Sequence, residues 1–364
     1  MEGGVLLVFL GVVAARFLLP LLILRYPLPA IIGCLLLDGV DQTIFQTFGY
    51  DPPGYQSYDK AMDVFYLAIA YLATLRNWQN LAAFRIARAL YFYRLVGVVL
   101  FEFTQVRALL MLFPNTFEYF FIAYEAVRSR WSPRRYGLHW WLVVAALIWV
   151  VVKLPQEWWI HVAKLDLTDV LSENAWAPPL LVALLGVVLA VLWFAVRPRL
   201  DPPDWEWRLV ADPLPEEMDT PAEQYAWHAE WGAVRSWATL EKVVLVGLIA
   251  VIYGQIVPGV RSTPVQMFFG VSAVVVLNAA FTLFLANRAL SNPSLFVAFL
   301  ARVVINLGLT YVYDTLLVSE GGDLRFGVTL FFMCLISLIT TLHDHYRPVL
   351  AVRVAEERAA RTTG

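Results

Sequence analysis

The chain has 364 residues, of which 60% are hydrophobic and 15% are charged. Because soluble domains contain about 45–50% apolar residues, this composition excludes an ordinary soluble protein and indicates an integral membrane protein. The net charge of −2, with basic residues scattered among apolar runs, predicts no nucleic-acid partner. Cys34 and Cys334 both lie inside apolar segments, so no disulfide framework is expected.

The apolar runs predict an all-α protein, a polytopic transmembrane helical bundle with short interfacial helices. A helix needs about 20 mostly apolar residues to cross a bilayer. By this criterion we expect about 11 spans, with roughly nine to twelve compatible with the usual error in boundaries. The predicted spans lie near residues 4–24, 28–46, 60–76, 94–113, 115–128, 138–154, 178–197, 243–260, 265–287, 294–317 and 325–342.

The basic segments predict the orientation of these spans, because loops rich in Lys and Arg stay on the cytoplasmic side. Arg128, Arg130, Arg134 and Arg135 follow the fifth predicted span, and the chain ends in a basic tail. In the cell inner (plasma) membrane, this pattern places the C-terminus in the cytoplasm and the N-terminus outside. No basic region precedes the first apolar run, so we expect that run to be a retained helix.

The distribution of spans predicts four regions. They are an N-terminal bundle of about seven spans over 1–197, a cytoplasmic linker rich in Pro, Trp and acidic residues over 198–242, a C-terminal bundle of about four spans over 243–346, and a basic cytoplasmic tail over 347–364. Within the linker, Thr220-Pro221-Ala222-Glu223 predicts the start of one short helix. No internal repeat supports an inverted-repeat transporter.

Four aspartates lie at the neighbouring ends of the second and third predicted spans: Asp38, Asp41, Asp59 and Asp63. Spacings of three and four residues put each pair on one face of its helix, and the predicted topology gathers all four at the outer mouth. Carboxylates at the edge of a membrane segment are energetically costly, so they indicate a structural or functional role. One interpretation is N-capping and ion pairing with Lys60 or an arginine; the other is a cation or proton site.

A second candidate lies in the segment from Pro155 to Asp166, which predicts a short interfacial helix with Glu157, His161 and Lys164 on one face. Glu157 and His161 are weak candidates for an acid and a base. They are too few for a zinc site, so no metal site is assigned. The simpler interpretation is the solvated face of a helix on the outer membrane surface.

The spacing of Arg85, Arg88 and Arg94 is typical of a voltage-sensing helix, but their position before an apolar run favours a basic helix on the cytoplasmic surface. In the later spans, Arg302 and Asn306 belong to one polar stripe. Their expected partners are Asn278, Gln255, Glu102 and Glu118. The stripe predicts either a static buried ion pair or part of a conduction path.

No short motif for nucleotide, metal or acyl-transfer chemistry occurs, so cofactors remain unknown. The favoured hypothesis is a transporter- or channel-like protein with an outward-facing acidic vestibule, in which Asp38, Asp41, Asp59, Asp63, Arg302 and Asn306 bind substrate, a cation or a proton. One alternative is a membrane-embedded transferase acting on a lipid-linked substrate from the extracytoplasmic side; another is a non-catalytic scaffold subunit. Expected partners are the lipid bilayer and a small molecule, an ion or a lipid headgroup.

Overall fold

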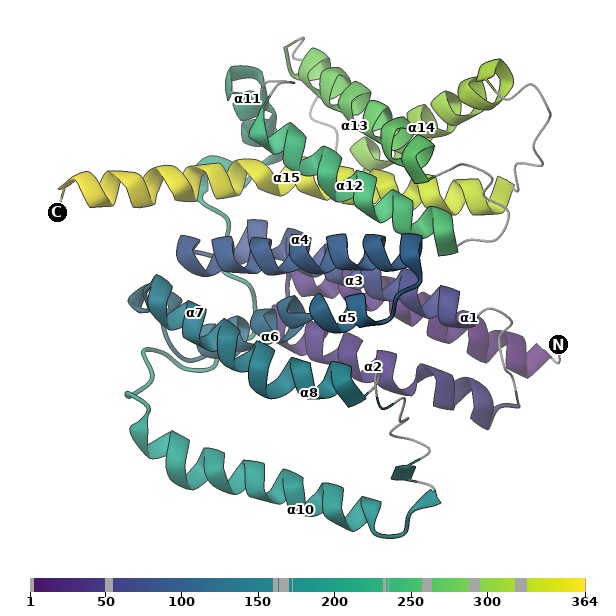
Figure 1. Ribbon diagram of the computed structural model, residues 1–364. Coiled ribbons are helices and arrows are strands. Elements are labelled where there is room, and N and C mark those ends of the chain that lie inside the picture. Colours follow the sequence, from purple (N-terminus) through teal and green to yellow (C-terminus); the bar gives the residue numbers. More distant parts are fainter. Residues whose placement is uncertain are drawn as a thin grey trace.

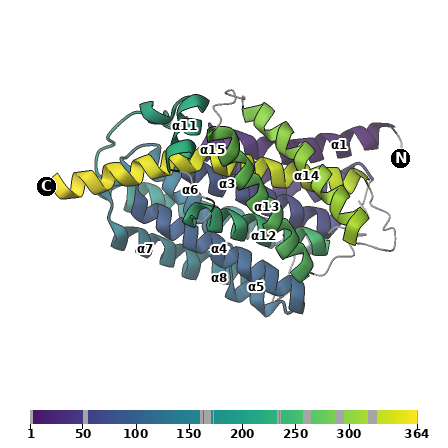
Figure 2. The same ribbon diagram turned by 90° about the horizontal axis from the view of Figure 1, so that it is seen from above.

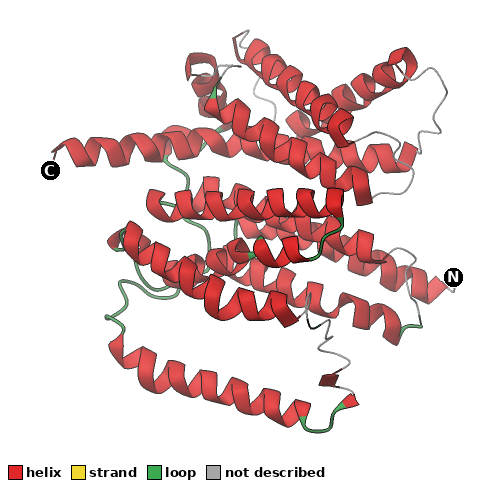
Figure 3. Cartoon of the chain, viewed as in Figure 1, coloured by secondary structure: helices red, strands yellow, loops and turns green. Residues whose placement is uncertain are grey.

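The computed structural model describes residues 3–49, 55–159, 163, 170–171, 173–231, 234, 236–256, 264–287, 295–317 and 326–363. Within these ranges the regular structure is helical and contains no strand (Figure 3). The predicted all-α class is therefore confirmed for the described part of the chain.

The N-terminal half forms a bundle of closely packed helices (Figure 1). Its elements are α1 (Gly3–Leu18), which continues as a 3₁₀ turn η1 (Leu19–Leu24), α2 (Pro27–Thr47), α3 (Tyr55–Asn77), α4 (Leu81–Thr104), α5 (Ala108–Leu112), α6 (Thr116–Arg128), η2 (Pro133–Arg135), and a continuous helix made of α7 (Leu138–Leu147), η3 (Ile148–Lys153) and α8 (Leu154–Glu157).

The remaining elements are α10 (Ala177–Ala190) with its extensions η5 (Val191–Val196) and η6 (Arg197–Arg199), η7 (Glu216–Met218), α11 (Pro221–Trp231), α12 (Trp237–Ile256), α13 (Pro264–Asn287), α14 (Leu295–Leu317) and α15 (Phe326–Thr363). Helix α10 lies along the edge of the bundle opposite α13 and α14 (Figure 1). Together with η5 it exposes large apolar side chains such as Val182, Leu189 and Phe194, as expected of a helix in contact with lipid.

Helix α3 is the centre of the structure. Its residues from Phe65 to Ala73 are at most 8% exposed, because α3 contacts α1, α2, α4 and α6 on one side and α12 and α15 on the other. The view from above shows α12 and α15 crossing over α3 and α4 (Figure 2). A helix that is apolar on all sides is buried by its neighbours, so α3 joins the N-terminal bundle to the C-terminal helices.

Four described helices are long and apolar enough to cross a membrane: Leu7–Leu24, Pro27–Thr47, Leu138–Glu157 and Trp237–Gly254. Phe268–Ala280 and Leu295–Leu309 are shorter apolar helices. The helices therefore fit a membrane protein, whereas the expected bundle of about 11 spans is not confirmed.

Two helices extend beyond the predicted boundaries. Instead of a span over 94–113, α4 begins at Leu81, where the Asn80 side chain caps the helix by accepting a hydrogen bond from Ala83 N at 2.9 Å. Arg85, Arg88 and Arg94 thus belong to α4 and not to a separate surface helix. Helix α15 continues past residue 346, and Val349 and Leu350 are buried; the division into a bundle and a basic tail stays a prediction.

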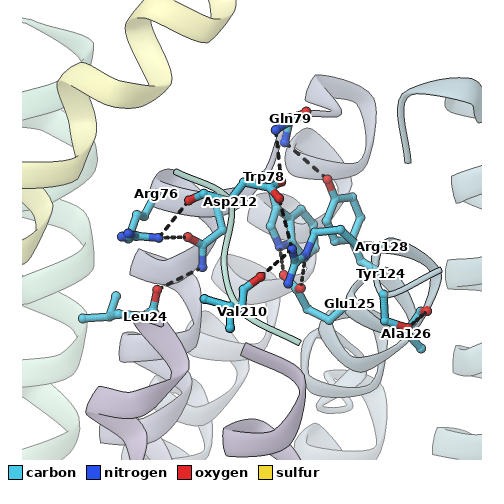
Figure 4. A network of polar contacts seen from close by, with 12 residues as sticks. Leu24, Arg76, Trp78, Gln79, Tyr124, Glu125, Ala126, Arg128, Val210 and Asp212 are labelled. Atoms are coloured by element: carbon cyan, nitrogen blue, oxygen red, sulfur yellow. Dashed lines mark hydrogen bonds and ion pairs between the residues drawn. The ribbon is translucent and has the colours of Figure 1, made fainter. Parts of the chain in front are cut away.

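A polar network ties together one end of α3 and α6, and we call it the Arg128 network: Trp78, Gln79, Glu125, Arg128 and Asp212 (Figure 4). Glu125 accepts hydrogen bonds from Trp78 Nε1 at 2.9 Å and Arg128 Nε at 2.6 Å. Asp212 accepts one from Gln79 Nε2 at 3.0 Å and lies 3.4 Å from Arg128 Nη1. The network therefore anchors the linker to the ends of these helices.

The same linker also reaches the end of α1 and the start of α2. Ala211 N donates a hydrogen bond to Arg25 O at 2.7 Å, next to the start of α2 at Pro27. Leu24 O accepts a hydrogen bond from Asn77 at 3.5 Å. The corresponding ends of α1, α2, α3 and α6 therefore lie in one layer. The position of a residue along the bundle is given below as its distance from this layer.

Candidate functional site

Arg16 of α1 lies among four aspartates of α2 and α3, and we call this group the Arg16 cluster. Its Nη2 atom lies 2.5 Å from Asp38 Oδ1 and 2.9 Å from Asp63 Oδ1. Its Nη1 atom lies 2.5 Å from Asp41 Oδ2 and 2.7 Å from Asp59 Oδ1. One guanidinium thus donates charge-assisted hydrogen bonds to carboxylates from two helices.

The spacing of residues along α2 and α3 explains why these carboxylates converge. Asp38 and Asp41 are one helical turn apart on α2, and Asp59 and Asp63 are one turn apart on α3. Since α1, α2 and α3 contact one another, the arginine on α1 reaches both pairs. The expected proximity of the four aspartates is therefore seen, and so is the ion pairing with an arginine of a neighbouring helix. The sequence did not identify that arginine as Arg16.

The Arg16 cluster lies far along its helices from the layer that the linker anchors. At about 1.5 Å per residue, Asp41 is roughly 21 Å from Pro27 along α2, and Asp63 is roughly 21 Å from Asn77 along α3. Both reference residues belong to the layer anchored by the linker. The cluster therefore lies toward the opposite ends of these helices, because α2 ends at Thr47 and α3 begins at Tyr55. The outer mouth stays a prediction.

Among the described residues of the Arg16 cluster the charges do not balance, because one guanidinium faces four carboxyl groups. Arg16 and Asp41 are almost fully buried, with side-chain exposures of 3% and 0%. The Asp38, Asp59 and Asp63 side chains retain 26%, 33% and 38% exposure, and a carboxylate oxygen from each lies within 4.8 Å of the others. Carboxylates this close together are suited to share protons or a hard cation.

Arg302 and Asn306 lie in a different group, on α14. Asp344 of α15 accepts from Arg302 Nη2 and from Lys242 Nζ, each at 2.6 Å. Although burial alone would raise the pKa of Asp344, these two cations hold it well below its usual value. The expected partner Glu102 instead lies 3.3 Å from Lys60. Arg302 therefore joins α12, α14 and α15 rather than extending the Arg16 cluster.

Asn306 makes the contact that its spacing predicted. Its Oδ1 accepts a hydrogen bond from Asn278 Nδ2 at 2.7 Å, and its Nδ2 donates one to Ser337 Oγ at 2.9 Å. Amide-to-hydroxyl contacts of this kind connect helices inside a bundle. The polar stripe on α14 is thus used in packing against α13 and α15.

Glu157 is buried, and this differs from the predicted solvated face. It is 4% exposed, and its Oε1 lies 3.7 Å from Lys153 Nζ and accepts from the Asn115 backbone N–H at 3.4 Å. His161 and Lys164 lie outside the described residues, so the pairing of Glu157 with His161 stays a prediction. The segment was misjudged because its helix continues inward as α7 and η3, whose lysine pairs with Glu157.

The structure also shows a helix break at Pro114, where the sequence predicted the boundary between the spans over 94–113 and 115–128. Helix α5 ends at Leu112 and α6 starts at Thr116, with Pro114 between them. The carbonyls freed by the break accept hydrogen bonds from α4: Tyr93 Oη lies 2.8 Å from Leu112 O, and Arg94 Nη1 lies 2.9 Å from Phe113 O. Broken helices of this kind are tolerated in membranes where neighbouring side chains satisfy the backbone. The sequence signal was Pro114-Asn115-Thr116 between apolar runs.

Helix α6 therefore begins inside the bundle, and its first turn carries Glu118. This carboxylate is 3% exposed. It accepts a hydrogen bond from Tyr66 Oη and a second from Asn115 Nδ2 at 2.9 Å. At about 1.5 Å per residue, Glu118 lies roughly 15 Å from Arg128, a depth close to that of Tyr66. A second buried acidic site thus lies beside the Arg16 cluster.

Comparison with known proteins finds no protein-family model, no curated protein and no solved structure that matches this chain.

Proposed function

We propose that this chain is a polytopic membrane protein of the inner (plasma) membrane that transports a small cation, a proton included, and binds it at the Arg16 cluster. The observation that carries the proposal is the charge imbalance within the described residues of that cluster: four carboxylates surround one guanidinium. Two of the three helices involved, α1 with its extension and α2, are apolar and long enough to cross a membrane. Ionisable groups inside membrane helices are destabilising unless paired, and where they occur they often mark ion pathways.

Arg16 would have a defined part in such a mechanism. A cation or proton arriving at Asp38, Asp59 or Asp63 reduces the negative charge that these groups present to Arg16. The attraction between the guanidinium and the carboxylates of α2 and α3 then weakens, and the packing of α1 against these helices can change. Such a site responds to occupancy because the same carboxylates bind either the arginine or the transported ion.

The helix arrangement supports a multi-span topology in this proposal. In it, the helices from α1 to α15 that run along the bundle cross the membrane, and the linker with the Arg128 network lies in the cytoplasm. The N-terminus lies outside, and the exposed apolar side chains of α10 contact lipid. The broken pair α5 and α6 crosses as one discontinuous span, a feature that transporters use to build ion sites.

The proposal is tested with purified protein in liposomes that contain a cation- or pH-sensitive dye. We expect ion-dependent flux that is lost in Asp63→Asn and retained in Asp201→Asn. Asp201 is a suitable control because its side chain is 67% exposed and only pairs with Arg135 at the surface. Flux no faster than that of protein-free liposomes for protons, Na⁺, K⁺, Mg²⁺ and Ca²⁺ would refute the function.

One observation favours a second candidate, a scaffold subunit. Asp344 is paired by both Arg302 and Lys242, and its backbone carbonyl lies 2.9 Å from His228 Nε2. A buried charge with this many partners fixes helix positions and needs no substrate. The same liposome experiment separates the two candidates, since a scaffold transports nothing by itself.

A further inference from the structure

We infer that the transported ion is a proton and that Glu118 carries it between the Arg16 cluster and the Lys153–Glu157 pair. The inference rests on the proposed function and extends it to a residue outside the Arg16 cluster. It depends on the contacts of Glu118, on the position of Tyr66 relative to the aspartates, and on the broken helix that places Glu118 inside the bundle.

The contacts of Glu118 are those of a group that can hold a proton. Its two closest hydrogen-bond partners, Tyr66 and Asn115, are neutral donors. Within the described residues, no lysine or arginine nitrogen lies within 4.0 Å of its carboxylate. A buried carboxyl group without a close cation favours its neutral, protonated form. Glu118 therefore differs from Glu125, which Arg128 contacts directly.

Tyr66 links Glu118 to the Arg16 cluster. Tyr66 and Asp63 are three residues apart on α3, so their side chains are neighbours on one helix face. The charges of Asp38 and Asp63 act on the Tyr66 hydroxyl, and Asp38 also acts on Glu118. Since Tyr66 is 4% exposed, its hydroxyl group is shielded from bulk solvent. The tyrosine thus stands between the aspartates and the glutamate.

The proton transfer through Tyr66 is balanced. The hydroxyl gives its proton to Glu118 and takes one from Asp63, so the tyrosine is unchanged and one proton moves from Asp63 to Glu118. A hydroxyl group is suited to this role because it is both a donor and an acceptor.

The far side of Glu118 leads to a second pair of charged groups. Asn115 donates through Nδ2 to Glu118 and through its backbone N–H to Glu157. Glu157 in turn lies 3.7 Å from Lys153, and the two side chains are 6% and 5% exposed. Lys153 and Arg94 act electrostatically on Glu118 from η3 and α4, as Asp38 does from α2. These cations would favour release of the proton from Glu118 toward Glu157.

The break before α6 supplies further polar atoms beside Glu118. Asn115 Oδ1 and Thr116 Oγ1 are buried and make no hydrogen bond within the described part of the chain. Buried polar atoms are normally satisfied. Together they would give a water molecule two partners, which is the minimum for an ordered buried water. The N-terminus of α6 therefore offers a polar path next to a carboxyl group.

The test combines infrared spectroscopy with proton flux. In pH-titrated difference spectra of the purified protein, we expect a band from a protonated carboxyl group that disappears in Glu118→Gln. The band should remain in Glu206→Gln, whose side chain is exposed. In liposomes, Glu118→Gln should lower proton flux by about a hundredfold, as removal of a proton-transfer group does.

Tyr66→Phe is the second variant, because it keeps the ring and removes only the hydroxyl. We expect slower proton flux and a shifted frequency of the Glu118 band, since one hydrogen bond to that group is lost; this variant also serves if Glu118→Gln does not fold. An unchanged infrared band in Glu118→Gln, or an unchanged frequency in Tyr66→Phe, overturns the inference. Absence of flux in the wild type, with the Glu118 band present, refutes transport and leaves Glu118 as the proton-binding group. Flux of another cation without proton flux overturns the inference and leaves transport standing.

Discussion

Replacement of Arg16 by glutamine removes the positive charge from the Arg16 cluster and leaves its carboxylates facing one another. Loss of one partner from a buried ion pair costs about 3–5 kcal/mol. We expect the upper part of this range, because Asp41 is fully buried and loses its 2.5 Å contact with the guanidinium. The more exposed aspartates add less, since solvent screens them.

The assay is thermal unfolding in detergent, followed by tryptophan fluorescence. Per-residue unfolding entropies convert about 3–5 kcal/mol into a decrease in Tm of roughly 4–7 °C for a chain of this length. The decrease should shrink at acid pH, because protonation of the aspartates removes their mutual repulsion. Arg16→Gln combined with Asp41→Asn should recover part of the loss, since both members of a buried pair are then neutral.

A matched control is Arg135→Gln, because Arg135 also contacts two aspartates, Asp201 and Asp204, but at the surface and at 3.4 and 3.5 Å. Exposed pairs contribute about 0–1 kcal/mol, so Tm should change little. If Arg16→Gln and Arg135→Gln have equal Tm values at neutral pH, the argument that the Arg16 cluster is a buried charge centre is refuted.

Three further variants test other parts of the structure. Gly97→Ala places a methyl group 2.1 Å from Phe113 Cβ and should lower stability by about 1–3 kcal/mol in the same unfolding assay, because the α5–α6 break packs on this glycine. Burial, and then the charge of Arg76, lower the pKa of His345 to about 4. The folded state therefore loses up to about 3 kcal/mol of stability as the pH falls from the unfolded pKa of about 6.5 to 4, and His345→Gln should abolish this loss. Asp212→Ala should speed tryptic cleavage of the linker, because the hydrogen bond and ion pair that anchor it at the Arg128 network are removed.

Each of these variants has a control or a result that would contradict it. Gly11→Ala should be neutral, since nothing lies within 4 Å of the added methyl group; equal losses for both glycines would contradict the packing argument. A wild type as stable at pH 4 as at pH 7, relative to His345→Gln, would contradict burial of neutral His345. Cleavage of the linker at the wild-type rate in Asp212→Ala would show that its backbone contacts alone hold it.

The sequence was sufficient to predict the helices and the closeness of the four aspartates, because both follow from local patterns. Apolar runs of about 20 residues predict membrane helices, and a spacing of three or four residues predicts a shared face. The role of the aspartates stays a prediction. Arg16 was missed because its partners are 22 to 47 residues away in sequence, and no periodicity reports which helix face meets which.

The same limit explains the misplaced boundaries. Apolar windows begin a span where the polar residues end, so Arg85 and Arg88 were assigned to a surface helix before a span that began at residue 94. In the structure they lie inside α4 because Arg88 pairs with Glu241 at 3.4 Å and Arg94 satisfies the broken backbone at Phe113. A charge with a partner costs far less than the same charge alone, and the identity of the partner is a property of the tertiary structure.

The two buried arginine groups differ in a way that assigns them different roles. At Asp344, two cations surround one carboxylate, so their positive charges would repel a further cation. At Arg16, one cation meets four carboxylates, so each added positive charge lowers the repulsion among them. A transported cation would therefore be attracted to α1, α2 and α3 and repelled from Arg302 and Lys242. In the proposed function, the C-terminal helices would stay fixed. Because α3 packs against both groups of helices, it would transmit a change at the Arg16 cluster to the rest of the bundle.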